Sequence, residues 1–384
     1  MIPDEEIREA WEEARSIRGG ARLVGLSKTG FRNRVNRLGL RDEADDRALQ
    51  AGMDAVGTDI TPRLVWAKTK PDEDGVAYSV LIKPEEKGPT DGAEQIREIM
   101  NGIERVDALP QIERCSSDLL GLIILSDIHV GMLAWGKETG VPYDTAEACR
   151  RIREWTSYAV ATMPPCSRCV ILFNGDTMHA DDTTNQTPAH RHNLDVDSRL
   201  MRSIDMAIES IVVAIESALI KHGQIEVVVK QGNHDPHSYM PLVFGLSGRY
   251  HNEPRVNVNQ EPSEYWSIEF GRTMITSHHG HNRRNPRDIA GDIADEWSEA
   301  WGRTKYRYLW ISHAHAREAG EAGGIMWERT NATAERDAYA SSRLYRGRAN
   351  IKAVIYSSAA GEVERKVISN EVIQSRSPEE TLGA

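Results

Sequence analysis

Cysteine is scarce in this sequence of 384 residues, and long apolar runs are absent from it. No uninterrupted apolar stretch approaches the roughly 20 residues that a membrane-spanning helix needs. The first six residues, MIPDEE, are acidic and lack the apolar core of a signal peptide. We therefore expect a cytoplasmic protein without a membrane partner.

Two of the four cysteines, Cys166 and Cys169, form a C-x-x-C pair. A structural zinc site needs a second such pair or histidines at matching spacing, and neither lies nearby in the sequence. We expect free thiols. A phosphate-binding loop of the G-x-x-x-x-G-K-S/T type is also missing. Any ATPase partner would therefore be a separate chain.

The formal net charge of −11 argues against a surface coated all over for nucleic acid, but the charge is unevenly distributed. The window from Gly19 to Arg41 contains no acidic residue. Its six basic residues are Arg22, Lys28, Arg32, Arg34, Arg37 and Arg41. Phosphate contacts supply much of the affinity of proteins for DNA, so this window is the best candidate for a DNA contact.

Residues 4–18 have helical patterning, which Gly19-Gly20 is expected to break. A short helix, a turn at Gly25, an N-cap at Ser27 and a second helix should follow. The expected core consists of Leu23, Leu26, Phe31, Val35 and Leu38. The stretch resembles the helix-turn-helix unit of small bacterial and phage DNA-binding modules, which implies DNA contacts from Lys28, Arg32, Arg34 and Arg37. The alternative is a helical hairpin used for docking or for assembly into a homo-oligomer.

The pattern divides the chain into four parts. The helix-turn-helix-like module covers residues 1–41. A linker at 42–118 should hold a β-hairpin (63–70 and 76–82), an exposed stretch (83–92) and a helix (93–106). In the third part, 119–370, strands alternate with helices at 144–160 and 197–221, and strands return at 350–357 and 362–368. This alternation favours a layered α/β core. Residues 371–384 form a tail.

Five predicted strands of the α/β part end in polar residues. Carboxyl ends of strands are where α/β folds build their sites, so these residues should meet at one edge. Strand alternation is expected to place Asp127 and His129 on the same face, where a carboxylate and an imidazole can hold a divalent metal. The five stretches are Asp127-x-His129, Gly175-Asp176, Gly232-Asn233-His234-Asp235, His278-His279-Gly280-His281 and His313-x-His315.

In this order, the five stretches resemble the signature of calcineurin-like metallophosphoesterases, over residues 119–368. The resemblance implies a two-sheet sandwich flanked by helices, with two divalent metal ions at the strand ends. Manganese is expected, and Fe, Zn or Mg stays open because Asp, His and Asn ligands accept each of them. One metal would be held by Asp127, His129 and His315, the other by Asn233, His279 and His313. Asp176 would bridge them.

The same resemblance implies the reaction. A hydroxide held between the metals would attack phosphorus while the cations neutralise the developing charge. His234 would donate a proton to the leaving oxygen or stabilise the transition state. Asp235 would orient His234 or cap the following turn. His278 and His281 are the neighbouring alternatives to His279.

The residues after Asp176 bear on the substrate. Protein serine/threonine phosphatases of this superfamily read Gly-Asp-x-x-Asp-Arg-Gly, whereas this chain has His179 and no such Asp-Arg pair. A His here is similar to repair nucleases of the SbcD kind. Thr187-Pro188 and Asp195-x-Asp197-x-Arg199 look like phage and prophage metallophosphoesterases. Candidate substrate contacts are His179, Arg191, Arg199 and His237.

These features predict a two-metal phosphodiesterase or nuclease that acts on DNA and is brought to it by the N-terminal module. A first alternative is a small-molecule phosphodiesterase or phosphomonoesterase whose N-terminal module serves assembly. A second is a DNA-binding regulator without catalytic activity.

Overall fold

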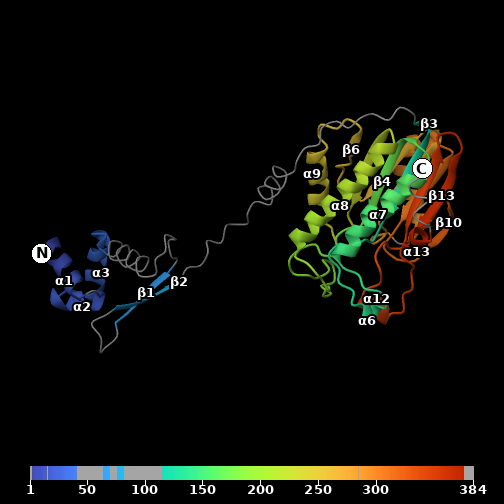
Figure 1. Cartoon of the computed structure of the whole chain (residues 1–384). Helices are drawn as coiled ribbons and strands as arrows, with labels where there is room; N and C mark the ends of the chain where they lie inside the picture. The colour runs from blue at the N-terminus through green and yellow to red at the C-terminus, as the bar shows by residue number, and fades with distance from the viewer. Residues whose placement is uncertain are drawn as a thin grey trace. The chain divides into compact units, whose positions relative to one another are not determined.

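Two units make up the chain, residues 1–93 and 94–384 (Figure 1). The computed structural model describes residues 2–14, 16–40, 115–283 and 285–375, together with the backbone of the strands at 64–69 and 76–81. The predicted linker stretch 83–92, the predicted helix 93–106 and the end of the tail, from residue 376 on, lie outside the described residues.

Within residues 2–40, the structure describes three helices of the N-terminal unit: α1 (Asp4–Ala14), α2 (Ile17–Leu23) and α3 (Lys28–Arg37). The predicted break at Gly19-Gly20 is wrong. Both glycines lie inside α2, which Ser16 begins by accepting a hydrogen bond from the Gly19 amide at 3.1 Å. The reason is packing: a Cβ at Gly20 would lie 2.4 Å from the Phe31 ring, so glycine lets α2 approach α3.

The core of this unit matches the prediction in part. Phe31 and Val35 are fully buried, together with Ile7, and Leu26 and Leu38 pack against them. Leu23 does not belong to this core, because 52% of its surface is exposed at the end of α2. The turn and the second helix follow the prediction: Gly25 has a left-handed φ of 64°, and Ser27 caps α3.

The predicted β-hairpin is present. Strands β1 (Leu64–Thr69) and β2 (Val76–Leu81) pair antiparallel, with Leu64 opposite Leu81. Turn-forming residues lie between them in the sequence.

The larger unit contains a six-stranded and a five-stranded sheet. The six-stranded sheet has the order β13 (Gly361–Ile368), β12 (Ile351–Ser357), β3 (Ser116–Leu125), β4 (Cys166–Asn174), β5 (Gln224–Lys230) and β6 (Val256–Val258). The five-stranded sheet has the order β10 (Glu318–Ala322), β11 (Ile325–Arg329), β9 (Tyr306–Ile311), β8 (Thr273–His278) and β7 (Tyr265–Phe270).

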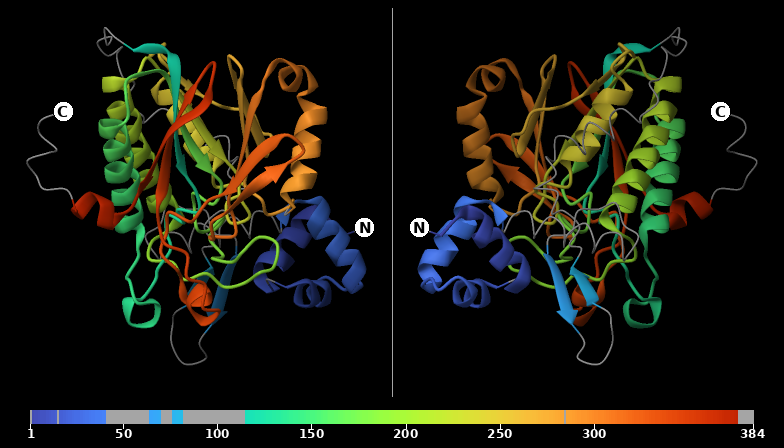
Figure 2. Two further views of the ribbon diagram at one scale, coloured as in Figure 1. Left: turned by 90° about the vertical axis from the view of Figure 1, so that its right-hand side faces the viewer. Right: turned by 90° about the vertical axis from the view of Figure 1, so that its left-hand side faces the viewer.

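Helices cover the outer faces of the two sheets (Figure 2). Against the six-stranded sheet lie α7 (Thr145–Thr162), α8 (Leu200–Lys221) and α9 (Met240–Arg249), and against the five-stranded sheet lie α10 (Pro286–Glu296) and α11 (Ser298–Arg303). The remaining helices are short: α6 (Gly136–Thr139), α12 (Ala338–Ser342) and α13 (Asn370–Gln374).

Alternating apolar residues explain this layering. In β3, Leu122 and Ile124 pack with Trp266, Trp310 and their neighbours between the sheets, whereas Ile123 and Leu125 face the cluster beneath the helices. The predicted α/β fold, a two-sheet sandwich flanked by helices, is therefore confirmed for the larger unit. All four cysteines are free, as expected. Among the helices that the structure describes, none is long and apolar enough to span a bilayer.

Strand direction brings the predicted site residues to one edge in each sheet. Strands β3, β4 and β5 are mutually parallel neighbours, and so are β8 and β9. Parallel neighbours end at the same edge of their sheet. The loops that carry the polar residues therefore leave from the carboxyl ends of five strands.

Two glycine substitutions with opposite expected effects on stability test the close packing of α2 against α3. Gly20→Ala places a methyl group against the Phe31 ring and should destabilise the N-terminal helices by at least about 1 kcal/mol. Hydrogen–deuterium exchange of the amides in α2 and α3 should become roughly fivefold faster or more. Gly291→Ala in α10 meets no atom within 4 Å, so this control should stabilise its helix by about 0.5–1 kcal/mol. Unchanged exchange in Gly20→Ala would contradict the close approach.

Candidate metal centre

The backbone of the strand-end loops is left-handed at most of the predicted ligands. Asp127, His129, Asp176, His313 and His315 have φ values between 48° and 72°, a region that non-glycine residues rarely adopt. The prediction that strand alternation places Asp127 and His129 on the same face is therefore wrong, because β3 ends at Leu125 and both residues lie in the following loop. They meet because this loop curls, with the Asp127 amide donating to the Gly175 carbonyl at 3.1 Å. Strand alternation plays no part.

One group of side chains surrounds Asp127, which is completely buried. His315 Nε2 lies 3.1 Å from Asp127 Oδ1, and the backbone N–H of His313 donates to Asp127 Oδ2 at 3.3 Å. Ligand atoms of Asp127, His129 and His315 all lie within 4.8 Å of one another. The three residues predicted to hold one metal are thus brought together.

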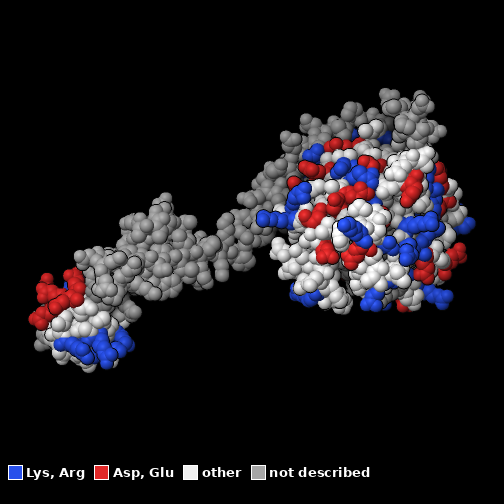
Figure 3. Space-filling model, turned by 60° about the horizontal axis from the view of Figure 1, so that its bottom comes forward, with Lys and Arg blue, Asp and Glu red and all other residues white. Residues whose placement is uncertain are grey.

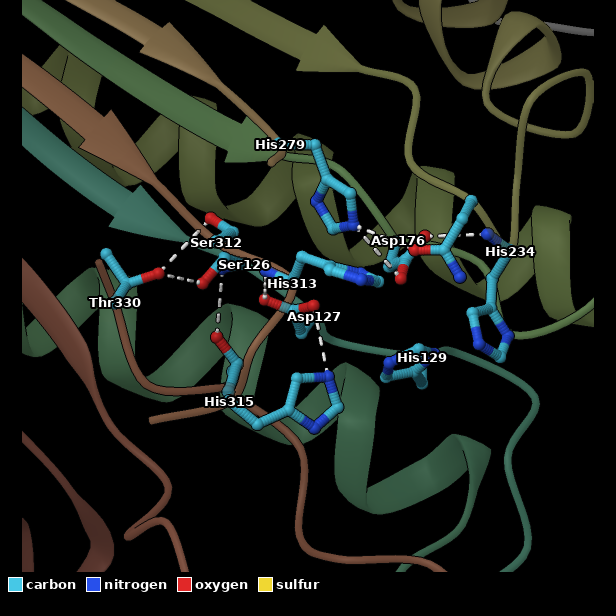
Figure 4. A network of polar contacts seen from close by, with 12 residues as sticks. Ser126, Asp127, His129, Asp176, His234, His279, Ser312, His313, His315 and Thr330 are labelled. Atoms are coloured by element: carbon cyan, nitrogen blue, oxygen red, sulfur yellow. Dashed lines mark hydrogen bonds and ion pairs between the residues drawn. The ribbon is translucent and has the colours of Figure 1, made fainter. Parts of the chain in front are cut away.

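A second group surrounds Asp176 (Figure 4). His279 Nε2 lies 3.2 Å from Asp176 Oδ2 and 3.3 Å from Asn233 Oδ1. His313 completes the group, since ligand atoms of Asp176, His279 and His313 lie within 4.8 Å of one another. The two groups adjoin, because His313 contributes its ring to this group and its backbone N–H to Asp127.

Two glycines make the second group sterically possible. A Cβ at Gly232 would lie 2.1 Å from Asp176 Oδ1, and a Cβ at Gly175 would lie 2.3 Å from the His279 ring. Gly175 also has a left-handed φ of 87°. The glycines that precede Asp176 and Asn233 in the sequence are therefore required by close approach.

His234 lies beside both groups. Its backbone N–H donates to Asp176 Oδ1 at 2.8 Å, and its ring Nδ1 lies 3.0 Å from the carbonyl oxygen of His179. The His179 ring contacts His129, with 3.3 Å between the two Nδ1 atoms. His129, His179 and His234 form a third cluster of closely placed ring nitrogens.

The carboxylate of Asp235 contacts three backbone amides. It accepts hydrogen bonds from Gly232 at 2.7 Å, Asp176 at 3.2 Å and Met178 at 3.1 Å, and it is fully buried. Burial and the charge of Asp176 raise the pKa of Asp235 to about 7. These amides belong to the turn before Asp235 and to the loop after β4, so the carboxylate joins the loops after β4 and β5. None of them belongs to the turn that follows Asp235 or to the His234 ring, so these contacts match neither of its two predicted roles.

The histidines of the site differ in the direction in which their pKa is shifted. Burial lowers the pKa of His129 well below its usual value, that of His313 to about 4 and that of His179 to about 3. Burial alone would also lower the pKa of His279, but the carboxylates of Asp176 and Asp127 raise it to about 10. Burial alone would raise the pKa of Asp176, whereas His279 and His234 hold it well below the usual range. His279 and Asp176 thus form an ion pair.

The donor set fits divalent metals. Each group pairs a buried carboxylate with two imidazoles, and Asn233 adds an amide oxygen beside His279. Oxygen and imidazole donors suit Mn, Fe and Zn, and do not distinguish among them. His279 and His129 are also held by second contacts, as metal-binding histidines are.

The neighbours of His279 in the sequence are placed differently. The ring of His278 stacks on Tyr265 with 4.4 Å between centroids, and its Nε2 lies 3.4 Å from Glu264, away from Asp176. The His281 ring centroid lies 5.5 Å from that of His279. His279 is the residue of the three that contacts Asp176.

A cavity of about 980 Å³ opens over both groups, and His179 is part of its lining. The other predicted substrate contacts, Arg191, Arg199 and His237, are absent from this lining. His237 is 73% exposed and pairs with Asp181 at 2.6 Å, and Arg199 precedes α8 at the surface. The cavity therefore gives these three residues no direct role.

Sequence reasoning missed one wall of this cavity, formed by α12 and the residues after it, among them Tyr339, Tyr345 and Arg346. A signal was present: residues 338–361 contain no Asp or Glu, and Arg343, Arg346 and Arg348 lie within six positions. The window from Gly19 to Arg41 near the N-terminus is likewise basic and without acidic residues.

No protein-family model and no curated protein sequence matches the chain. Among solved structures, it is similar to an uncharacterized protein from Streptococcus pneumoniae described as a predicted phosphoesterase, at 14% identity and a TM-score of 0.28, covering 66% of this chain and 100% of that one. An archaeal phosphodiesterase shares 12% identity at a TM-score of 0.33, covering 65% and 99%. Zinc-bound Vps29 from Entamoeba histolytica shares 10% at 0.28, covering 65% and 98%.

The ion pair predicts a pH dependence of metal binding. His279 Nδ1 faces the carbonyl oxygen of Asn174 at 2.9 Å and therefore carries a hydrogen, so the proton that titrates is on Nε2. Below the pKa of about 10 this nitrogen is protonated, and a metal must displace the proton. Mn²⁺ affinity should rise by up to about tenfold per pH unit toward that pKa.

Calorimetric titration with Mn²⁺ near pH 8, in two buffers of different ionisation enthalpy, measures the number of protons that the metal displaces. We expect about one proton per protein from His279. His192→Ala, which changes an exposed histidine outside both groups, should release the same number. A binding enthalpy independent of the buffer would contradict the ion pair.

Proposed function

We propose that the protein is a metal-dependent phosphoric ester hydrolase, and more specifically a phosphodiesterase that acts on DNA. One observation carries the proposal: two carboxylate–imidazole groups adjoin through His313 and open into the same cavity. A pair of adjacent cations is suited to a phosphoester, because both can share the charge that develops on the phosphoryl oxygens.

Each residue has a distinct task in this proposal. Asp127, His129 and His315 would hold one cation, and Asp176, Asn233, His279 and His313 the other, with Mn²⁺ as the proposed metal. When bound, such cations supply Lewis-acid charge and lower the pKa of water. The two oxygens of the Asp176 carboxylate contact different partners: Oδ2 lies 3.2 Å from His279 Nε2, and Oδ1 accepts from the backbone N–H of His234 at 2.8 Å.

His234 is the proposed proton donor. A carbonyl oxygen only accepts hydrogen bonds, so the contact with His179 places a hydrogen on His234 Nδ1. The ring is thereby oriented, and Nε2 is left as the atom that exchanges a proton. As an imidazolium, with a second hydrogen on Nε2, His234 would donate that proton to a leaving oxygen in the cavity that it lines.

The N-terminal unit supports the DNA part of the proposal. Lys28 and Arg32 are exposed on α3, and Figure 3 shows Lys and Arg gathered on one side of this unit and Asp and Glu on another. Arg34 and Arg37 both donate to the carboxylate of Asp4, at 2.5 Å and 2.7 Å. These two guanidinium groups would have to leave Asp4 before they contact phosphate, so Lys28 and Arg32 are the leading candidates.

Hydrolysis with Mn²⁺ tests the proposal. Purified protein should cleave DNA and bis-p-nitrophenyl phosphate faster than p-nitrophenyl phosphate. Asp176→Asn, which keeps the side-chain size beside Gly232, should lower these rates at least about a hundredfold, more than the loss typical of residues around a metal's ligands. His192→Ala is the control with unchanged rates. Undiminished DNA cleavage by Asp176→Asn would refute the proposal, and turnover of the monoester alone would favour a small-molecule phosphatase.

Salt dependence of duplex binding tests the N-terminal unit. Lys28→Ala with Arg32→Ala removes two proposed phosphate contacts and should lower the slope of log K against log salt by about 1.8. Asp4→Asn should act in the opposite direction, because it frees Arg34 and Arg37. Fluorescence anisotropy of a labelled duplex gives both slopes. Equal slopes in all three proteins would assign α3 to assembly rather than to DNA.

A further inference from the structure

The wall of the cavity opposite the strand-end loops is basic and aromatic. Tyr339 and Tyr345 are 59% and 56% exposed, and both line the cavity together with Arg346. The acidic residues on the same wall are engaged: Glu335 pairs with Arg151 at 2.7 Å, and Asp337 caps α12 by accepting from the Ala340 amide at 2.7 Å. Arg346 therefore offers positive charge to a ligand on this wall, beside the carboxylate of Asp337, which keeps its charge.

Arg346 continues the basic surface beyond the cavity. It also lines a neighbouring groove of about 480 Å³, to which Arg317, Arg348 and Lys352 contribute. Arg317 and Lys352 are matched by Glu328, at 3.1 Å and 3.5 Å. Within the described part of the chain, no carboxylate pairs with Arg346 or Arg348, and both are exposed. These two arginines form a cationic path from the metal groups into the groove.

The turn after α12 fixes the backbone that leads into Arg346. The Tyr345 amide donates to the Ala340 carbonyl at 3.0 Å, and the Leu344 amide donates to that of Ser341 at 3.1 Å. This pattern ends a helix with a left-handed residue, which is commonly glycine. Here the residue is Leu344, with φ of 58° and 66% of its surface exposed. Tyr345 and Arg346 therefore follow a fixed turn, and an apolar side chain stands beside them in the cavity.

We propose that residues 339–348 form a track for single-stranded DNA, an inference that rests on the proposed phosphodiesterase function. Arg346 and Arg348 hold backbone phosphates next to the one at the metal groups, and the ring of Tyr345 stacks on an unpaired base. A single strand is favoured over a duplex because bases in a duplex are already stacked and offer no free face to a tyrosine. Arginines that follow a backbone, alternating with aromatic rings, are the usual elements of single-strand sites.

Anisotropy titration of the full-length protein with labelled oligothymidylate of about 12 nucleotides, in EDTA to prevent cleavage, tests the track. Arg346→Ala with Arg348→Ala should weaken binding about tenfold or more and lower the salt slope by about 1.4, or about 0.7 for each lost phosphate contact. The N-terminal arginines are present in every protein compared, so a change in slope belongs to Arg346 and Arg348. The matched control is Arg272→Ala, an exposed arginine at the amino end of β8, about 20 Å along the strand from His278.

The tyrosine is tested separately. Tyr345→Ala should weaken single-strand binding roughly tenfold, whereas Tyr345→Phe, which keeps the ring, should bind as the unmodified protein does. Circular dichroism melting identifies any variant that is misfolded. If the alanine pair at Arg346 and Arg348 is misfolded, Arg346→Gln with Arg348→Gln replaces it.

The outcomes separate the track from the proposed function. A salt slope that the arginine pair leaves unchanged, or a loss of affinity as large for a duplex measured in parallel as for the single strand, would overturn the track. The hydrolysis of bis-p-nitrophenyl phosphate by the unmodified protein, measured in parallel with Mn²⁺, reports on the metal groups alone. Failure of that hydrolysis would refute the function, whereas failure of the slope test with hydrolysis intact refutes only the track.

Discussion

The close approach of Asp176 to two other loops is the constraint on which the site depends. Its carboxylate occupies the space that a Cβ of Gly232 would need, at 2.1 Å, and the His279 ring occupies that of Gly175, at 2.3 Å. The carboxylate comes from one sheet and the imidazole from the other, so the sandwich has to close to hydrogen-bonding distance at this edge. The backbone accepts left-handed φ values at Asp176 and its neighbours to make this possible.

A network of hydroxyl groups holds the two sheets together directly beneath the site (Figure 4). Ser126, after β3, bonds Thr330 at 2.7 Å, and Asn174, at the end of β4, bonds Ser312 at 2.7 Å, with Thr330 and Ser312 3.2 Å apart. These contacts join strands of the six-stranded sheet to the ends of β9 and β11. These buried contacts restrict the loops that carry Asp127 and His313, which preorganises the donors for a cation.

The sequence was sufficient to predict the strands and the order of the site residues, because apolar runs followed by Asp, His and Asn leave few alternatives in a parallel sheet. It could not supply the backbone path, since the left-handed turns at Asp127 and His129 depend on amide contacts with the loop after β4, nearly fifty residues away. The same limit explains Gly20, whose place inside α2 is set by Phe31. The wall around Tyr345 was missed because its position depends on α12 packing beside α6, two short helices far apart in the chain.

The candidate metal ligands and the proposed substrate contacts come from different parts of the fold. Every candidate ligand follows a strand of the sandwich, and the contacts beneath it are buried. The aromatic and basic wall instead belongs to α12 and the turn after it. Just before α12, Arg336 joins the α6 segment by donating to the Thr139 carbonyl at 2.6 Å. Few buried apolar contacts hold such a turn, so substitutions there cost the sandwich little. Under the proposed function, the preference of the wall for a base or a phosphate can therefore change while the two carboxylates keep their places.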